Sequence, residues 1–261
     1  MGSEKIDNCS YNVSCYADDI FITSTTVPGL QKLINVANQY ISRHGLSFNP
    51  TKTQVIVFGK CTLAQWPEWH LNGTNLQDYS HNGIKYLGTT LSQNTKDHIE
   101  TQIKACRRAY YAMQGAGLHC GGLSPNTIAH VWSTALQPVL TYGMPCLPLT
   151  KSSLKDLDRA QARLLKTSLG LSKFCKSTPL LNAMKIPKIS DLYDQYSLNL
   201  LRAHLDNDAK GRVFYSYMFK WHSVHPSSSQ SNLVTRCQAV CRNNGISLHK
   251  FLLNDEYYGM C

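Results

Sequence analysis

The chain has 261 residues and carries a net charge of +10, from 26 Lys and Arg against 16 Asp and Glu. Apolar residues make up 43% of it and aromatic residues 10%, which excludes wholesale disorder because disordered chains are rich in charge and poor in aromatic side chains. Its apolar runs fall far short of the ~20 residues of a membrane-spanning helix, and its N-terminus lacks the apolar segment of a signal peptide. We therefore expect an intracellular protein, in the nucleus or the cytoplasm, that does not enter a membrane.

The positive charge is concentrated in the second part of the sequence. Residues 1–100 contain seven Lys and Arg and eight Asp and Glu, whereas residues 101–261 contain nineteen and eight. A region with a net charge of +11 is suited to bind a polyanion such as nucleic acid. A basic surface without any special partner would give the same count, so charge alone leaves both interpretations open.

Two short apolar segments near the N-terminus surround a pair of acidic residues. Residues 13–16 and 20–23 have the composition of β-strands, and Asp18 and Asp19 fall in the short turn between them. Adjacent carboxylates raise each other's pKa unless a cation compensates their charge, and Mg²⁺ prefers oxygen ligands of this kind. Two-metal phosphoryl transfer uses such an arrangement. An ordinary exposed turn would have the same sequence.

A mixed pattern of helix and strand continues along the first ninety residues. Pro28-Gly29 opens a segment in which apolar residues recur on one helical face, and Gly45 ends it. Strand patterns follow at residues 53–58 and 84–91, and a strong two-residue hairpin signal lies between them at Asn72-Gly73.

After residue 94 the apolar residues recur at helical spacing. The helical patterns cover residues 99–113, 126–141, 151–169, 178–184 and 189–205. A polar, Ser-rich stretch at residues 222–232 is typical of a linker. We therefore predict an α+β protein with three regions, which are a mixed region over residues 11–93, a helical region over 94–205 and a C-terminal tail region over 206–261.

Several segments together resemble the reverse transcriptases of non-LTR (LINE-type) retrotransposons. Cys15-Tyr-Ala-Asp-Asp-Ile-Phe-Ile22 is similar to the metal-binding hairpin of the polymerase palm in this family, and residues 45–58 are similar to a segment that follows it. Ile84-Lys-Tyr-Leu-Gly88 resembles the strand at the primer grip, and residues 136–143 and 156–170 resemble segments that follow the thumb. The resemblance covers about residues 11–205, and its specificity lies in the common order and spacing of these segments.

The resemblance implies an RNA-directed DNA polymerase, a nucleotidyltransferase that acts on an RNA template and a DNA primer. It assigns Mg²⁺ binding and catalysis to Asp18 and Asp19, and it places Lys52 near the incoming nucleotide as a general acid for pyrophosphate. A solvated lysine is the alternative for Lys52, and a strand core residue is the alternative for Tyr86. The residues implied to hold the primer are Tyr16, Lys85, Tyr86, Leu87 and Gly88.

The chain departs from this family in one large respect. These polymerases need a third carboxylate and the fingers upstream of the acidic turn, but only seventeen residues precede Asp18. We therefore expect the C-terminal half of a palm followed by a thumb-like helical region, which would be inactive alone and would need the missing N-terminal polymerase half as a partner. The origin of such a chain, as a truncated gene model or a decayed transposable element, stays open.

A basic stripe is predicted on the helix over residues 151–169. Its cations fall within one arc of the helix surface, while leucines occupy the other side. Phosphate backbones bind such a face without any reading of sequence, although a solvated face would look the same. The stripe supports a second hypothesis for function, a non-catalytic nucleic-acid-binding remnant that uses the helical region. The five cations are Lys151, Lys155, Arg159, Arg163 and Lys166.

Four potential zinc ligands lie near the C-terminus, at Cys237, Cys241, His249 and Cys261. Related elements often end in a Cys/His knuckle, but the spacing here is not that of a usual zinc finger. We expect these thiols to be free, because zinc is disfavoured by the spacing and disulfides are disfavoured in an intracellular protein.

Overall fold

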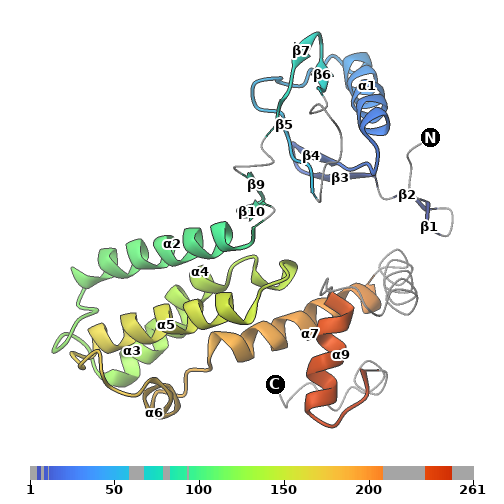
Figure 1. Cartoon of the computed structure of the whole chain (residues 1–261). Coiled ribbons are helices and arrows are strands. Elements are labelled where there is room, and N and C mark those ends of the chain that lie inside the picture. Colours follow the sequence, from blue (N-terminus) through green and yellow to red (C-terminus); the bar gives the residue numbers. More distant parts are fainter. Residues whose placement is uncertain are drawn as a thin grey trace. The chain divides into compact units, whose positions relative to one another are not determined.

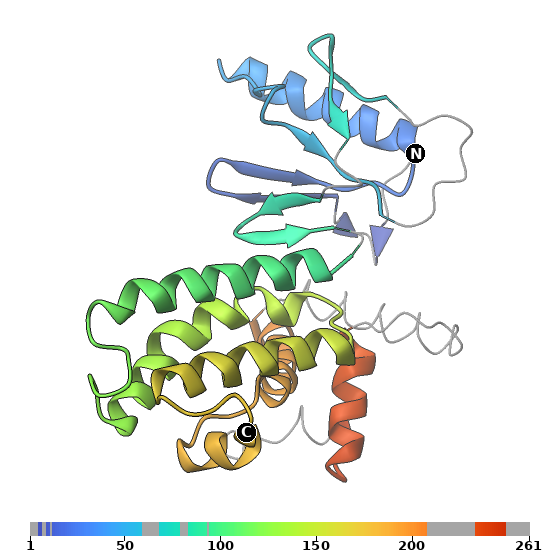
Figure 2. The same cartoon turned by 60° about the vertical axis from the view of Figure 1, so that its left-hand side comes forward.

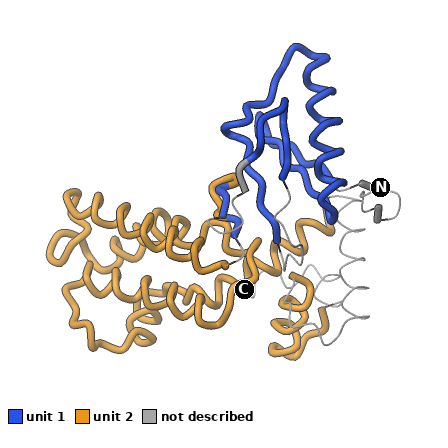
Figure 3. The backbone as a smooth tube through the Cα atoms, turned by 45° about the horizontal axis from the view of Figure 1, so that its top comes forward, with its two compact units in different colours: residues 1–85, 91–93, 209–217 blue, residues 86–90, 94–208, 218–261 orange. Residues whose placement is uncertain are grey.

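The computed structural model describes residues 5–6, 9–10, 12–58, 68–78, 83–92, 94–207 and 233–248. Its elements are α+β, as the sequence predicts, with short paired strands in the first part and helices in the second (Figure 1). The chain divides into two compact units (Figure 3). The first, here the mixed unit, comprises residues 1–85, 91–93 and 209–217, and the second, the helical unit, comprises residues 86–90, 94–208 and 218–261.

An antiparallel hairpin and one long helix form the centre of the mixed unit. Strand β3 (Val13–Tyr16) pairs with β4 (Asp19–Ile22), and helix α1 (Val27–Arg43) contacts β4. The helix begins after Thr26, whose hydroxyl accepts a hydrogen bond from the Gly29 N–H and so caps the first turn. Both elements agree with the sequence pattern.

Short strand pairs complete the mixed unit. Strand β6 (His70–Leu71) pairs with β7 (Thr74–Asn75) around Asn72 and Gly73, which both have positive φ, as the hairpin signal predicts. The strand predicted over residues 53–58 is shorter, since only β5 (Gln54–Val55) is extended and paired, in parallel, with β8 (Gln77–Asp78). Two further strands, β1 (Lys5–Ile6) and β2 (Cys9–Ser10), pair with each other. Among the described residues of this unit, the buried apolar side chains that form its core are Ile34, Val55, Trp69, Leu71 and Leu76.

The single strand predicted over residues 84–91 is wrong. The chain instead forms a hairpin from β9 (Ile84–Tyr86) and β10 (Thr89–Leu91). The turn residues Leu87 and Gly88 have φ of +46° and +79°, the left-handed backbone that a tight two-residue hairpin requires. Glycine favours this conformation but leucine rarely adopts it. The sequence therefore indicates the turn at Gly88 but not at Leu87.

The described part of the helical unit consists mainly of helices. Helices α2, α4 and α5 lie side by side (Figure 2), and α5 also packs on α7. The predicted helices are present with small shifts of their ends, and a short 3₁₀ turn, η2 (Met144–Cys146), precedes α5. The helices are α2 (Lys96–Gln114), α3 (Pro125–Val131), α4 (Gln137–Thr141), α5 (Lys151–Ser168), α6 (Ser177–Ala183), α7 (Ile189–Asn207) and α9 (Leu233–Asn243).

The helix predicted over residues 126–141 is interrupted by a π-helical turn, η1 (Trp132–Leu136). Here the Gln137 N–H bonds to the Trp132 carbonyl, five residues back. Pro138 follows directly and has no N–H to donate to a carbonyl four residues back, which removes one α-helical hydrogen bond at this point. The widened turn accommodates that loss.

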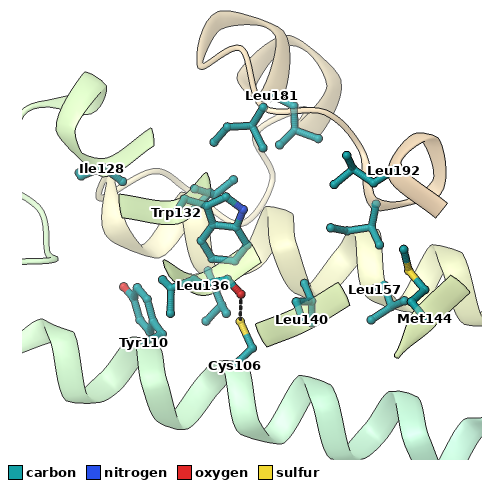
Figure 4. Close-up of a cluster of buried hydrophobic side chains, with 14 of the residues drawn as sticks. Cys106, Tyr110, Ile128, Trp132, Leu136, Leu140, Met144, Leu157, Leu181 and Leu192 are labelled. Atoms are coloured by element: carbon teal, nitrogen blue, oxygen red, sulfur yellow. Dashed lines mark hydrogen bonds between the residues drawn. The ribbon is translucent and has the colours of Figure 1, made fainter. Parts of the chain in front are cut away.

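The core of the helical unit gathers around two side chains that do not reach solvent, Trp132 and Cys106 (Figure 4). The Cys106 thiol donates to the Leu136 carbonyl at 3.6 Å, and burial raises its pKa to about 11. The Trp132 indole N–H donates to Gln161 Oε1 at 3.1 Å, and Gln161 Nε2 donates to the Pro187 carbonyl at 2.9 Å. These bonds satisfy buried polar groups and tie α5 to the segment before α7.

Candidate functional site

Asp18 lies in the turn between β3 and β4, as predicted, whereas Asp19 is the first residue of β4. Tyr16 is opposite Asp19 in the register, so the turn consists of Ala17 and Asp18. Both carboxylates are exposed, and Tyr16 next to them is 64% exposed. Within the described part of the chain, neither carboxylate has a hydrogen bond or an ion pair. The hairpin therefore presents two uncompensated negative charges to solvent.

Ala17 holds this turn in a strained conformation. Its φ is +52°, in the left-handed region that costs a residue with a Cβ atom about 1–2 kcal/mol. Strain of this kind is concentrated at functional sites, where the surrounding structure maintains it. The hairpin ladder from Val13↔Ile22 to Tyr16↔Asp19 is what holds the turn here.

Asp18 and Asp19 are the residues of the hairpin that could hold a divalent cation. Carboxylate oxygens suit Mg²⁺, which takes six oxygen ligands. Two carboxylates leave most of these positions to water, to substrate phosphates or to another acidic group. No group of three or more potential metal ligands is found among the residues that the structure describes.

Lys52 lies in the mixed unit, in a turn that Asn49 organises. The Asn49 carbonyl accepts the N–H groups of Lys52 and Thr53, and its side-chain oxygen accepts the N–H and the hydroxyl of Thr51. The Lys52 side chain is exposed, with no ion-pair partner among the described residues. Its place near the acidic turn stays a prediction.

A hydrogen-bonded clasp holds the turn between β9 and β10. The Tyr142 hydroxyl donates to the Leu87 carbonyl at 2.8 Å. The Thr90 N–H donates to Nδ1 of the buried His98 at 3.2 Å, and His98 Nε2 lies 2.9 Å from the Tyr142 carbonyl. Since Nδ1 accepts a hydrogen bond from Thr90, it carries no proton, so the single ring proton is on Nε2 and is donated to the Tyr142 carbonyl. His98 is therefore neutral. Burial lowers the pKa of His98 and favours this neutral form.

Two glycines make the clasp possible. A Cβ atom on Gly88 would lie 2.9 Å from the Tyr142 ring, and one on Gly143 would lie 2.5 Å from Thr89 Oγ1. Both glycines also have positive φ, +79° and +72°. The structure thus brings together two sequence segments, residues 84–88 and 136–143, that the sequence presents as separate motifs.

Sequence reasoning missed His98 and Tyr142 as supports of the turn. The available signal was the Tyr142-Gly143 pair, since a glycine in a helical region often marks a close approach. Of the predicted primer contacts, Lys85 and Gly88 are exposed, whereas Tyr86 is partly buried. Both interpretations of Tyr86, core residue and primer contact, remain open.

Helix α5 presents its cations on an exposed face. Lys151, Lys155, Arg159 and Arg163 are exposed and Lys166 is half-buried, while the buried face carries Leu157, Leu164 and Leu165. Asp156 and Asp158 lie between the cations of this stripe in the sequence. In the structure only Asp156 interrupts the exposed face, where it pairs with Arg159 at 3.1 Å. Asp158 instead accepts the Ile189 N–H at 2.7 Å and so caps the first turn of α7.

The two cysteines of the possible zinc site that the structure describes are buried on α9, which packs on α7. Burial raises the pKa of the Cys237 thiol to about 12, and this disfavours the thiolate that binds zinc. The other two ligands, His249 and Cys261, lie outside the described residues, as does the predicted linker over residues 222–232.

Comparison with known proteins supports a reverse transcriptase family, without a subtype, in the first part of the chain. None of the helices in the described ranges is both long and apolar enough to span a membrane. A search of curated proteins and a search of solved structures found no match. Residues 3–91, which include the acidic hairpin, Lys52 and the β9–β10 turn, match the family model for reverse transcriptase (RNA-dependent DNA polymerase). The first third of the chain is thus similar to reverse transcriptases.

Proposed function

We propose that this chain is the palm-and-thumb part of an RNA-directed DNA polymerase of the kind found in non-LTR retrotransposons. One observation carries the proposal. The segment that matches the reverse transcriptase family model places Asp18 in a tight hairpin turn and Asp19 directly after it at the start of β4, with both residues exposed. Exposed, unpaired carboxylates in a strained turn suit metal-dependent phosphoryl transfer better than a structural role, because a structural role would give them partners.

Each predicted residue has a task in this reaction. Asp18 and Asp19 would hold Mg²⁺, which would supply stabilisation of the negative charge that develops when the 3′-hydroxyl of the primer displaces pyrophosphate. The exposed ring of Tyr16 lies against the primer end, and Lys52 donates a proton to pyrophosphate. The β9–β10 turn, held by its clasp, presents Lys85 and the Gly88 backbone to the primer strand.

The hairpin by itself is not a complete active site. No third carboxylate joins Asp18 and Asp19 in the described part of the chain, so we expect no primer extension unless another polymerase segment supplies one. Primer extension with Mg²⁺ by the isolated chain, lost on Asp18→Ala, would contradict this part of the proposal.

Cleavage by bound iron tests the metal site without the need for activity. Fe²⁺ replaces Mg²⁺ at oxygen sites and, with ascorbate and peroxide, generates radicals that cut the backbone nearby. We expect cuts near residues 16–20 that excess Mg²⁺ suppresses and that the double variant Asp18→Asn, Asp19→Asn abolishes. Asp97→Asn, which changes an exposed aspartate on α2, is the control and should leave the cuts unchanged. Cuts that persist in the double variant would refute the site.

A non-catalytic role in nucleic-acid binding is the second candidate function. It is favoured by the basic face of α5, where Lys151, Lys155 and Arg163 have no carboxylate partner among the described residues. Phosphate contacts release counterions, so affinity should fall steeply as salt rises. The face would bind RNA and DNA strands without sequence preference.

Charge reversal on this face tests the second candidate. Lys155→Glu with Arg159→Glu should weaken binding to all sequences about equally and flatten the salt dependence by roughly one unit per lost contact. Lys185→Glu with Arg242→Glu makes the same charge change at exposed positions of the helical unit outside α5. Equal losses of affinity in the two double variants would mean that only the net charge of the protein matters. The basic face of α5 would then be an ordinary solvated surface.

A further inference from the structure

A groove of about 440 Å³ lies between the first half of α5 and the segments that begin α6 and α7. Its lining includes three hydroxyl groups, two leucine side chains and one aspartate, all within the helical unit. Three of its cations come from α5 and the fourth comes from the connection between α6 and α7. These cations are Lys151, Lys155, Arg159 and Lys188.

The protein compensates the positive charge of the groove only in part. Arg159 pairs with Asp156 at 3.1 Å. Asp158, the one carboxylate among the described lining residues, accepts the N–H groups of Ile189 and Ser190 at 2.7 and 3.4 Å at the start of α7. No carboxylate pairs with Lys151, Lys155 or Lys188 in the ranges that the structure describes. Like charges around one small volume repel each other, and an anion bound among them would remove that repulsion.

The other lining groups indicate which anion fits. The hydroxyls of Ser177 and Thr178 can donate to phosphate oxygens, while Leu154 and Leu181 offer an apolar wall. A phosphodiester joined to a sugar presents this same combination of charged and apolar surface. The groove also shares Lys155 and Arg159 with the basic face of α5, so one strand can follow the face and continue into the groove.

We propose that this groove seats a backbone phosphate of a bound nucleic-acid strand, with Lys188 as the cation that closes it from the side opposite α5. The inference rests on the proposed nucleic-acid binding and adds a defined phosphate position to it. Lys188 distinguishes the groove from the basic face, because it does not belong to α5. Its side chain is partly buried, and its carbonyl accepts the Leu192 N–H in the first turn of α7, which fixes its backbone.

A matched pair of lysine variants tests the proposal on the full chain. Lys188→Gln removes the charge from the groove, and Lys185→Gln removes the same charge from an exposed position three residues earlier that does not line it. Fluorescence anisotropy with a labelled single-stranded oligonucleotide at several salt concentrations gives the affinity and the salt slope. We expect Lys188→Gln to weaken binding about three- to tenfold and to reduce the salt slope by about one unit, as loss of one phosphate contact does. Lys185→Gln should remain near the wild type.

The remaining outcomes distinguish the groove proposal from the proposed nucleic-acid binding by the basic face of α5. If Lys188→Gln binds like the wild type while Lys155→Glu with Arg159→Glu binds weakly, the groove proposal is wrong and the basic face stands. If none of these variants changes binding, both fail. Inorganic phosphate titrated in NMR spectra provides a further arm. Phosphate binding that depends on Lys188, with oligonucleotide binding unchanged, would assign the groove to a free phosphorylated ligand and overturn the strand position.

Discussion

Replacing Gly143 with alanine should destabilise the helical unit far more than a similar change in open space. Gly143 has a φ of +72°, and its new Cβ atom would lie 2.5 Å from Thr89 Oγ1 and 3.3 Å from His98 Cε1. The backbone conformation costs about 1–2 kcal/mol for alanine, and relief of the contacts adds about 1–3 kcal/mol because a well-packed region must shift. We expect a total loss of about 2–5 kcal/mol in the free energy of unfolding.

Gly121→Ala is the control for this prediction. Gly121 belongs to the same unit and has a similar φ of +83°, but nothing lies within 4 Å of its Cβ position. Denaturation in urea should therefore show only the conformational cost for Gly121→Ala. Amide hydrogen exchange at Thr90, whose N–H bonds to His98, should accelerate in Gly143→Ala alone. Equal losses of stability in the two variants, with Thr90 still protected, would refute the clasp.

Three other predictions concern the helical unit. Folding lowers the pKa of the buried His98. The stability that neutral His98 contributes should therefore be complete above pH ~6.5 and should fall as the pH drops toward the folded-state pKa. Thermal melts should show this pH dependence in the wild type but not in His98→Gln, and a wild type insensitive to pH in this range would contradict the neutral assignment. Asp158→Ala should cost about 1 kcal/mol in urea denaturation through loss of the α7 cap, whereas Asp158→Asn, which keeps an acceptor oxygen, should cost less. A thiol reagent should label the exposed Cys120 in the native protein but Cys237 only after unfolding, because burial raises the pKa of Cys237 to about 12. Equal labelling rates of the two thiols in the native protein would contradict the burial of Cys237.

Elements whose signals are local could be predicted from the sequence. The acidic turn between β3 and β4, the Asn72-Gly73 hairpin and the amphipathic helix α5 each follow from residues close together in the chain. Propensity, turn chemistry and helical period act over a few residues, so one sequence suffices to find them. The exposed placement of Asp18 and Asp19 follows from that same turn.

Features that depend on distant residues could not be predicted. The turn at Leu87 is held by Tyr142, 55 residues later, and nothing near Leu87 indicates a left-handed backbone. Asp158 looks like an interruption of the basic stripe, but it caps a helix that begins 31 residues further along. The groove at Lys188 likewise forms only when three helices meet, so neither its cations nor its wall could be grouped from the sequence.

The position of the primer end tests the central claim most directly. A primer on an RNA template, carrying a photoreactive nucleotide at its 3′ end, would be cross-linked to the full chain in the presence of Mg²⁺, and the attached peptide would be identified by mass spectrometry. The proposed function predicts attachment within residues 13–22, dependent on Mg²⁺ and lost in Asp18→Asn with Asp19→Asn, whereas the same group placed inside the duplex should attach elsewhere. Attachment of the 3′ end outside this hairpin, or attachment unaffected by Mg²⁺ and by the double variant, would contradict the assignment of a polymerase site to this chain.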